Sequence, residues 1–285
     1  MIKLVTDTSA NLPADLIKRY AITIIPFSYS INGKEIVGGS DDFDGKAFYD
    51  AMRSGADVKT SMINVSQFEK AFSAMLEEEN DVLYIAMSGG ISGTANAADI
   101  AAKELADKYP DRKIMVINSL AASMGEGLLV LEAAKMIEEN KSFDEVCAQI
   151  LKLKETMCQF FTVDDLQYLK RGGRITGATA FIGTVLQIKP LLKGDEMGRI
   201  ISCGKVRGRK NSLLALAEKY DLLAADKSDT ISIAHGDCEE DALELIDMLK
   251  QKGFCGECIN VCYEPVTGSH VGPGTVALFF PGIHK

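Results

Sequence analysis

Short apolar runs alternate with amphipathic segments over the first half of the chain. Apolar runs of strand length cover residues 3–6, 81–87 and 113–117. Apolar side chains recur at helical spacing over residues 66–76, 94–108, 123–139 and 142–157. Two of these helices open with capping-box patterns, Ser66 with Glu69 and Ser142 with Glu145. Strands separated by helices predict a mostly parallel sheet flanked by helices.

The pattern changes after residue 157. Strand-like runs cover residues 159–163, 187–192, 199–206, 230–235, 257–263 and 275–280, and helical patterns cover 164–170, 210–224 and 239–252. Two of these runs flank a turn at residues 194–198, which predicts an antiparallel hairpin. We therefore expect an α/β protein of two α/β subdomains. Residues 1–157 form the first, with a mostly parallel sheet, and residues 158–285 form the second, with a mixed sheet that contains the hairpin.

Composition is that of an ordinary globular protein and narrows the choice of partners. Of the 285 residues 47% are hydrophobic, which is too many for a disordered chain. The net charge of -9 argues against a nucleic-acid partner and against attachment to an anionic membrane. No apolar stretch approaches the roughly 20 residues of a membrane span. The first residues lack a signal-peptide pattern, so we expect a cytoplasmic protein without stable membrane insertion.

The seven cysteines do not indicate a disulfide framework, because their number is odd and they are scattered. Cys255, Cys258 and Cys262 are spaced closely enough to suggest a metal site. A structural zinc site needs four ligands, and no histidine or second cysteine pair lies near these three in the sequence. We therefore interpret them as packed thiols and expect no metal.

Residues 88–94 form a glycine-rich loop between a predicted parallel strand and a helix. Ligands of open α/β sheets bind at such places, and the helix start offers N–H groups to an anion. Ser88, Ser92 and Thr94 add hydroxyl groups. The alternative is a plain strand-to-helix turn that needs glycine and a cap. The loop lacks the Gly-Lys-Ser/Thr ending of a P-loop and the spacing of a dinucleotide fingerprint, so a nucleotide binder or phosphotransferase is not indicated.

A serine hydrolase or acyltransferase is a second hypothesis for the same loop. Residues 86–90 resemble a nucleophile elbow in which alanine replaces the first glycine. Ser88 or Ser92 would be the nucleophile, and His270 the base. The sequence offers no defined acid partner for this histidine.

Two further segments carry candidate polar groups. Residues 268–275 hold three glycines and a proline around His270, which predicts a tight loop whose imidazole either binds a ligand or caps local carbonyls. Thr60 and Ser61 are a hydroxyl pair ahead of the helix expected from Ser66. Alone they indicate no more than a turn or a cap.

Arg171 and Arg174 frame a glycine pair after a short predicted helix. Such a pair could bind a phosphate or an acidic partner. It could equally place two cations against the negative end of the helix. The residues alone slightly favour the structural interpretation.

Taken in order, these segments resemble the DegV family of bacterial fatty-acid-binding proteins almost from end to end. The matching segments are residues 6–12, 59–61, 88–94, 166–175, 189–190, 205–207 and 268–274. Each is weak alone, but together their order and spacing are specific. Met62 and Ile63 stand where the family usually has glutamine and proline.

The resemblance implies two α/β subdomains with a long-chain fatty acid held between them. It implies a non-catalytic carrier that presents the fatty-acid carboxylate to a separate fatty acid kinase, whose acyl phosphate feeds phospholipid synthesis. No cofactor is implied besides the fatty acid itself. The carboxylate contacts would be Thr60 or Ser61, Ser92 with the adjacent Gly93 and Thr94, and His270. Arg207 matches a basic position tied to kinase docking, and Arg171 and Arg174 match an element with a role that is structural first.

The chemistry of these residues is consistent with that carrier. A carboxylate removed from water needs several hydrogen bonds, which hydroxyl and imidazole groups can supply. The acyl tail would gain about 0.8 kcal/mol per buried methylene, so it needs a long apolar channel. Candidates for the channel lining are residues 178–188, Phe160, Phe161, Phe279 and Phe280.

Overall fold

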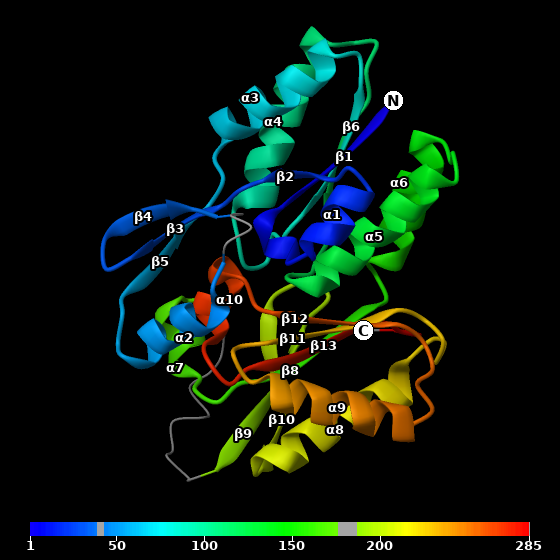
Figure 1. Cartoon of the computed structure of the whole chain (residues 1–285). Helices are drawn as coiled ribbons and strands as arrows, with labels where there is room; N and C mark the ends of the chain where they lie inside the picture. The colour runs from blue at the N-terminus through cyan, green and yellow to red at the C-terminus, as the bar shows by residue number, and fades with distance from the viewer. Residues whose placement is uncertain (39–42, 176–186, 285) are drawn as a thin grey trace.

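The computed structural model describes residues 1–38, 43–175 and 187–284, and its strands form three sheets (Figure 1). The first sheet is parallel, with the strand order β2-β1-β6-β7. Its strands are β1 (Ile2–Asp7), β2 (Thr23–Ile25), β6 (Asp81–Ala86) and β7 (Ile114–Asn118). This confirms the parallel sheet predicted from the alternating pattern.

Helices cover both faces of this sheet because its strands are apolar on both sides. Val82 and Tyr84 pack with α3 (Val65–Glu77) and α4 (Thr94–Lys108). Leu83 and Ile85 face the opposite way, toward α5 (Met124–Glu138) and α6 (Phe143–Leu153). Runs buried on both faces are typical of parallel sheets. The short η1 (Thr8–Ala10) and α1 (Ala14–Arg19) follow β1.

Of the two predicted capping boxes, one is confirmed and one is wrong. Ser142 and Glu145 form the box that opens α6. The box of α3 is made by Asn64 and Gln67 instead of Ser66 and Glu69. Asparagine caps as well as serine does, so the helix begins at the earlier of two overlapping patterns.

The second sheet is mixed and has the order β10-β9-β8-β13-β11-β12. Its strands are β8 (Met157–Thr162), β9 (Ile188–Gly194), β10 (Ile200–Arg207), β11 (Ile231–His235), β12 (Cys258–Cys262) and β13 (Val276–Pro281). β9 and β10 are antiparallel, which confirms the hairpin, and only β11 and β12 among the pairs described in this sheet run parallel. α8 (Arg209–Leu223) and α9 (Glu239–Gln251) cover the outer face of this sheet. The other helices in this half of the chain are α7 (Gln167–Arg171) and α10 (Pro265–Val271).

A small third sheet was not expected from the pattern. It has the order β4-β3-β5 and consists of β3 (Ser28–Ile31), β4 (Lys34–Val37) and β5 (Val58–Ser61), with α2 (Gly45–Arg53) between the last two along the chain. These four-residue strands are partly or fully exposed and carry no apolar run, so the pattern did not predict them. Thr60 and Ser61 are the last two residues of β5.

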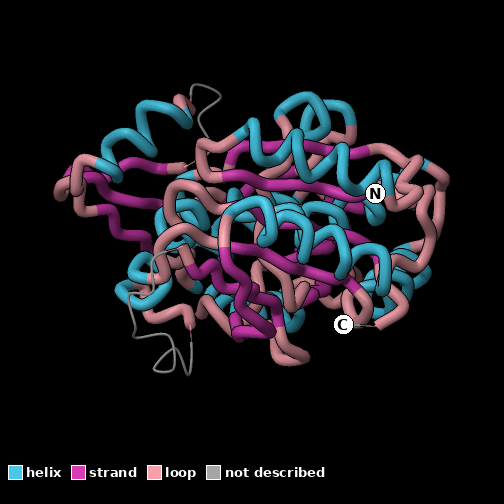
Figure 2. The backbone as a smooth tube through the Cα atoms, turned by 90° about the horizontal axis from the view of Figure 1, so that it is seen from below, coloured by secondary structure: helices cyan, strands magenta, loops and turns pink. Residues whose placement is uncertain are grey.

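Helix α5 lies between the two large sheets (Figure 1), and Figure 2 shows helices and strands stacked over one another when the molecule is seen from below. Helix α5 contacts β1 and β6 of the first sheet and β8, β11 and β13 of the second. Gly125 would place a Cβ 3.0 Å from Phe279 on one side, and Gly127 would place one 2.6 Å from the Ala10 carbonyl oxygen on the other. The predicted subdomain boundary near residue 157 falls after α6, but the core cluster around α5 contains residues from both halves.

The tip of the β9–β10 hairpin rests on the loop that follows β6. The Ser88 hydroxyl donates to the Gly198 carbonyl oxygen at 2.8 Å and accepts from the Gly90 N–H at 3.0 Å. Gly198 has a φ of 70°, and a Cβ there would overlap the Ser88 hydroxyl. The hairpin is thus fixed against the first sheet's loop. In the described ranges, no helix combines the length and apolar character needed to span a membrane.

Replacing Gly198 with alanine tests this contact, and Gly33 is the matched control. Both glycines have positive φ, but a Cβ at Gly33 meets nothing within 4 Å. We expect Gly33→Ala to lower the free energy of unfolding by about 1 kcal/mol through backbone strain alone. Gly198→Ala should cost about 2 kcal/mol more because the Cβ also displaces Ser88. Urea unfolding measures both, and equal losses would contradict the docking.

Candidate functional site

A narrow pocket lies between the two large sheets, at the carboxyl end of β6. It is lined by β5, the 88–93 loop, the start of α5, β8, the hairpin and α10. Its apolar walls are Phe27, Met62, Met87, Ile91, Ala121, Ala122, Phe161, Leu169, Ile200, Val266 and Val271. The free volume is about 90 Å³, below the roughly 300–1,000 Å³ of common ligand pockets. A large ligand would therefore have to move side chains.

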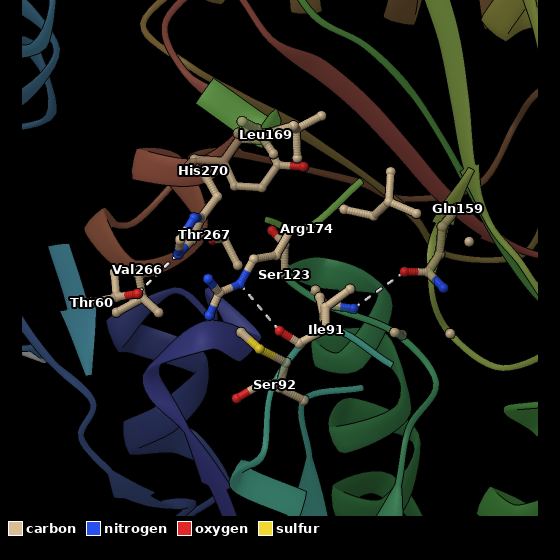
Figure 3. Close-up of a pocket in the computed structure, with 18 of the residues that line it drawn as sticks. Thr60, Ile91, Ser92, Ser123, Gln159, Leu169, Arg174, Val266, Thr267 and His270 are labelled. Atoms are coloured by element: carbon tan, nitrogen blue, oxygen red, sulfur yellow. Dashed lines mark hydrogen bonds between the residues drawn. The ribbon is translucent and has the colours of Figure 1, made fainter. Parts of the chain in front are cut away.

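Polar groups from four separate segments line this pocket, and Figure 3 shows Thr60, His270 and Arg174 on one side of it with Gln159 on the other. Thr60 comes from β5, Ser92 from the glycine-rich loop, Arg174 from the segment after α7, and His270 from α10. Thr60 Oγ1 and His270 Nε2 are 2.9 Å apart and hydrogen-bonded. Residues 210 positions apart in the sequence are thereby joined in the pocket lining.

Ser92 is held in place by the loop and helix that follow it. Its hydroxyl lies 2.9 Å from the Thr94 hydroxyl and accepts from the Thr94 N–H at 3.3 Å. Thr94 is buried in the first turn of α4, so it fixes the serine from behind. Gly93 is exposed and packs against Met62. Of the three loop residues expected to contact a carboxylate, only Ser92 lines the pocket.

The imidazole of His270 is neutral at pH 7. Burial lowers its pKa to about 4, and the charge of Arg174 acts in the same direction. A neutral imidazole can donate from one nitrogen and accept at the other, so it can support the Thr60 hydroxyl without carrying charge.

The expected loop at residues 268–275 is wrong in its first half, because His270 lies in the last turn of α10. Pro265 occupies the first helical turn, and the Glu264 side chain accepts from the N–H groups of Val266 and Thr267. These helix-start signals outweigh the cost of Gly268 inside the helix. The helix ends at Gly272, which has a φ of 81°.

Gly172 allows the close approach of His270 to the segment after α7. A Cβ at Gly172 would overlap the imidazole Nδ1. Arg174 follows two residues later and donates to the carbonyl oxygens of Ile91, at 3.3 Å, and of Gly172. The glycine pair and Arg174 thus bring the chain of the second half against the loop of the first. Sequence reasoning placed Arg174 outside the main site, whereas the structure puts its guanidinium in the pocket lining.

Carboxyl groups behind the pocket anchor these elements. Asp7 accepts from Tyr84 Oη at 2.6 Å and is hydrogen-bonded to the Ser9 hydroxyl, whose oxygen lies 2.9 Å from Glu126 Oε2. Desolvation raises the pKa of Asp7 and Glu126, both of them fully buried. Desolvation also raises the pKa of Glu264, the cap of α10, to about 7.

Other expected residues lie outside the pocket. Ser61 is exposed next to Thr60. Arg171 stacks over the Tyr168 ring at 4.7 Å and lines a second, more open hollow of about 430 Å³. That hollow shares Thr60, Arg174 and His270 with the pocket, so the two cavities are neighbours. Arg207 is exposed at the end of β10, the edge strand.

The contacts do not form the nucleophile–base pair of a serine hydrolase. The Ser88 hydroxyl bonds to the hairpin, the Ser92 hydroxyl to Thr94, and His270 Nε2 to Thr60. Among the described residues, neither serine is hydrogen-bonded to the imidazole that would have to activate it.

The expected apolar lining is only partly correct. Phe161 lines the pocket. Phe160 and Phe280 stack in the separate core beneath α8, with ring centroids 6.2 Å apart, and Phe279 packs in the central core. Successive strand residues face opposite sides of a sheet, so neighbouring phenylalanines could not all face one channel. Of the expected stretch 178–188, residues 178–186 lie outside the described residues.

Fold and site together define an α/β protein with two sheets joined by a shared helix and a mostly apolar pocket between them that also holds a few polar groups. The sequence profile described as "Uncharacterised protein, DegV family" matches residues 1–281. A DegV domain-containing protein of Clostridium perfringens is 38% identical over 282 residues, which cover 98% of this chain and 97% of that one. The chain belongs to the DegV family.

Solved structures of the family share the whole fold. A DegV family protein from Thermus thermophilus, described as fatty-acid binding, has a TM-score of 0.87 at 31% identity, and the match covers 98% of each chain. A fatty acid binding DegV family protein from Streptococcus agalactiae also has a TM-score of 0.87, at 28% identity and with 98% of each chain covered. Among the residues that the structure describes here, no group of three or more His, Cys, Asp or Glu side chains could hold a metal ion.

His270 is expected to make stability depend on pH. The unfolded imidazole has its usual pKa of 6.5, so between pH 6.5 and about 4 the unfolded state binds the proton that the folded state excludes. The contribution of His270 to stability is fully present above pH 6.5 and falls by about 3 kcal/mol as pH drops to 4. The buried carboxyl groups change stability with pH in both proteins, so urea unfolding at several pH values should show wild type losing more stability than His270→Gln over this range. Equal losses in the two proteins would contradict the buried, neutral imidazole.

Proposed function

We propose that this protein binds a long-chain fatty acid, with the carboxylate at Thr60, Ser92 and His270 and the acyl tail between the two sheets. The observation that carries the proposal is a mostly apolar pocket into which four separate segments bring Thr60, Ser92, Arg174 and His270. That combination matches an amphiphile with one small polar head. The relatives described as fatty-acid binding, which share the fold, support the same ligand.

The hydroxyl groups would supply the hydrogen bonds that a desolvated carboxylate needs. If His270 Nε2 donates to Thr60 Oγ1, the Thr60 hydroxyl is free to donate to the ligand. Ser92 would donate from the opposite loop, with Gly93 and Thr94 holding it in position. Hydrogen bonds to a charged acceptor contribute about 1.5–3 kcal/mol each.

Arg174 would offset the charge of the bound carboxylate. Its guanidinium is the cation of the pocket lining and donates to backbone carbonyl oxygens, with no carboxylate paired to it among the described residues. An unpaired cation close to two hydroxyl donors favours an anionic head group over a neutral one. We therefore propose a larger role for Arg174 than the sequence indicated.

The tail would occupy the apolar part of the pocket after its flexible side chains move. Met62 and Met87 both line the narrow pocket, and methionine side chains change conformation at little energetic cost. A buried tail contributes about 0.8 kcal/mol per methylene, which is enough to drive such rearrangement.

A carrier fits the site better than a catalyst, because the histidine supports a hydroxyl rather than activating a serine. The carrier would present its cargo to a separate fatty acid kinase for acyl-phosphate formation and phospholipid synthesis. The second hollow supports this step. It is also lined by Thr60 and His270, and its charged residues are Lys59, which pairs with Asp57 at 2.6 Å, Arg171 and Arg174. The two arginines suit a transferred phosphoryl group. The fatty acid is the ligand, and no further cofactor is proposed.

Fatty-acid affinity tests the head-group assignment. We expect Thr60→Val and Ser92→Ala each to weaken palmitate binding by about tenfold or more, since each removes a hydrogen bond to a charged acceptor. Ser61→Ala is the matched control, because it deletes an exposed hydroxyl one residue away. Isothermal titration after delipidation measures all three. Wild-type protein that neither carries nor binds fatty acid would overturn the proposed function.

Kinase docking is a separate proposal and rests on Arg207. Arg207→Ala should leave palmitate affinity unchanged but lower phosphorylation of the bound fatty acid by a purified fatty acid kinase about tenfold or more. Lys205→Ala is the control, because Lys205 is exposed two residues away on the same face of β10. If Arg207→Ala behaves like Lys205→Ala, the docking role is wrong while fatty-acid binding stands.

A further inference from the structure

Ser123 places a hydroxyl inside the pocket that the head group does not use. Its side chain is 1% exposed, and it lines the pocket at the start of α5. Figure 3 labels it in the middle of the view, near Arg174, with Thr60 and His270 to its left and Gln159 to its right. Within the described residues its Oγ has no hydrogen-bond partner.

The hydroxyl of Ser123 has no local structural task. It makes no capping hydrogen bond, although Ser123 occupies the N-cap position of α5. The backbone there has a φ of 52° and a ψ of -142°, a conformation that suits glycine better than serine. Serine is thus costlier than glycine at this position, and burying its unpaired hydroxyl adds to the cost.

The polar neighbours of Ser123 are either satisfied or poorly aligned with it. Gln159 accepts from the Ala122 N–H at 3.2 Å and donates to the Leu120 carbonyl oxygen at 2.9 Å. The Tyr263 side chain is buried beside Ser123. Burial raises the pKa of the Tyr263 hydroxyl, and the nearby Ser123 hydroxyl lowers it to a lesser extent. The contact between these two hydroxyl groups does not meet the geometry of a hydrogen bond.

We infer that Ser123, with Tyr263 beside it, forms a polar site within the tail channel. This site selects fatty acids that carry a hydroxyl or oxo group on the acyl chain. This inference rests on the proposed function and names its substrate class. A chain oxygen next to Ser123 gains a hydrogen bond where a methylene leaves the serine unpaired. A chain oxygen elsewhere in the channel meets apolar walls and loses its hydration without replacement.

Competition between stearate and its hydroxy derivatives tests the inference. Hydroxystearates with the hydroxyl at successive carbons are titrated against delipidated wild-type protein, Ser123→Ala and Thr162→Val. Thr162 is the matched control, because its Oγ1 is also buried without a hydrogen-bond partner in the described residues but does not line the pocket. Ser123→Ala keeps the backbone strain and removes only the hydroxyl.

We expect one positional isomer to bind wild-type protein as tightly as stearate or up to about fivefold more tightly, and the other isomers about tenfold or more weakly. In Ser123→Ala the favoured isomer should weaken about tenfold while stearate affinity is unchanged, and Thr162→Val should behave as wild type. Stearate binding with every isomer equally weak overturns the inference and leaves the proposed function intact. Weaker stearate binding in Ser123→Ala also overturns it, because Ser123 would then belong to the head-group site. Failure of wild-type protein to bind stearate overturns the proposed function itself.

Discussion

The packing of α5 between the two large sheets is the constraint on which the rest of the structure depends. One helix can serve two sheets only if it buries residues toward both, and nearly every residue of α5 from Met124 to Ala134 is buried. Gly125 lets Phe279 of the second sheet approach closely, and Gly127 does the same for Ala10, which follows β1. The shared helix sets the separation of the sheets, and its N-terminal end lies in the pocket wall. The glycine-rich loop of the first sheet and α10 of the second both line the pocket, and Thr60 of β5 is hydrogen-bonded there to His270.

Backbone architecture was predictable because periodicity reports burial directly. β1, β6, β7, α4, α6 and the hairpin follow from apolar spacing or turn residues, whereas the three-residue β2 was not predicted. The third sheet was not predictable from the sequence, because backbone pairing rather than an apolar face holds its short strands. α10 was missed because Gly268 and Gly272 indicate a loop, whereas the helix depends on the Glu264 cap. A cap by glutamate ahead of Pro265 is the signal that would have found it.

Site residues were predictable only through their order along the chain. Thr60, Ser92 and His270 lie on elements far apart in sequence, and no local pattern shows that they meet. The resemblance to the DegV family supplied that information, whereas the structure added Arg174 and Ser123 to the pocket. Neither residue could be identified from the sequence, for a physical reason. Arg174 follows Gly172, whose lack of a Cβ lets His270 pack against this segment. Ser123 is a common residue type in an unusual backbone conformation.

The most direct test of the account is the position of a bound fatty acid in a crystal of the delipidated protein soaked with a palmitate analogue brominated at its last carbon. If the ligand binds as proposed, the carboxylate lies within hydrogen-bond distance of Thr60 and Ser92. The bromine then gives an anomalous peak between the two sheets, toward Gln159. A carboxylate at the surface, or a bromine peak in the open hollow lined by Lys59 and Arg171, would contradict the proposed binding.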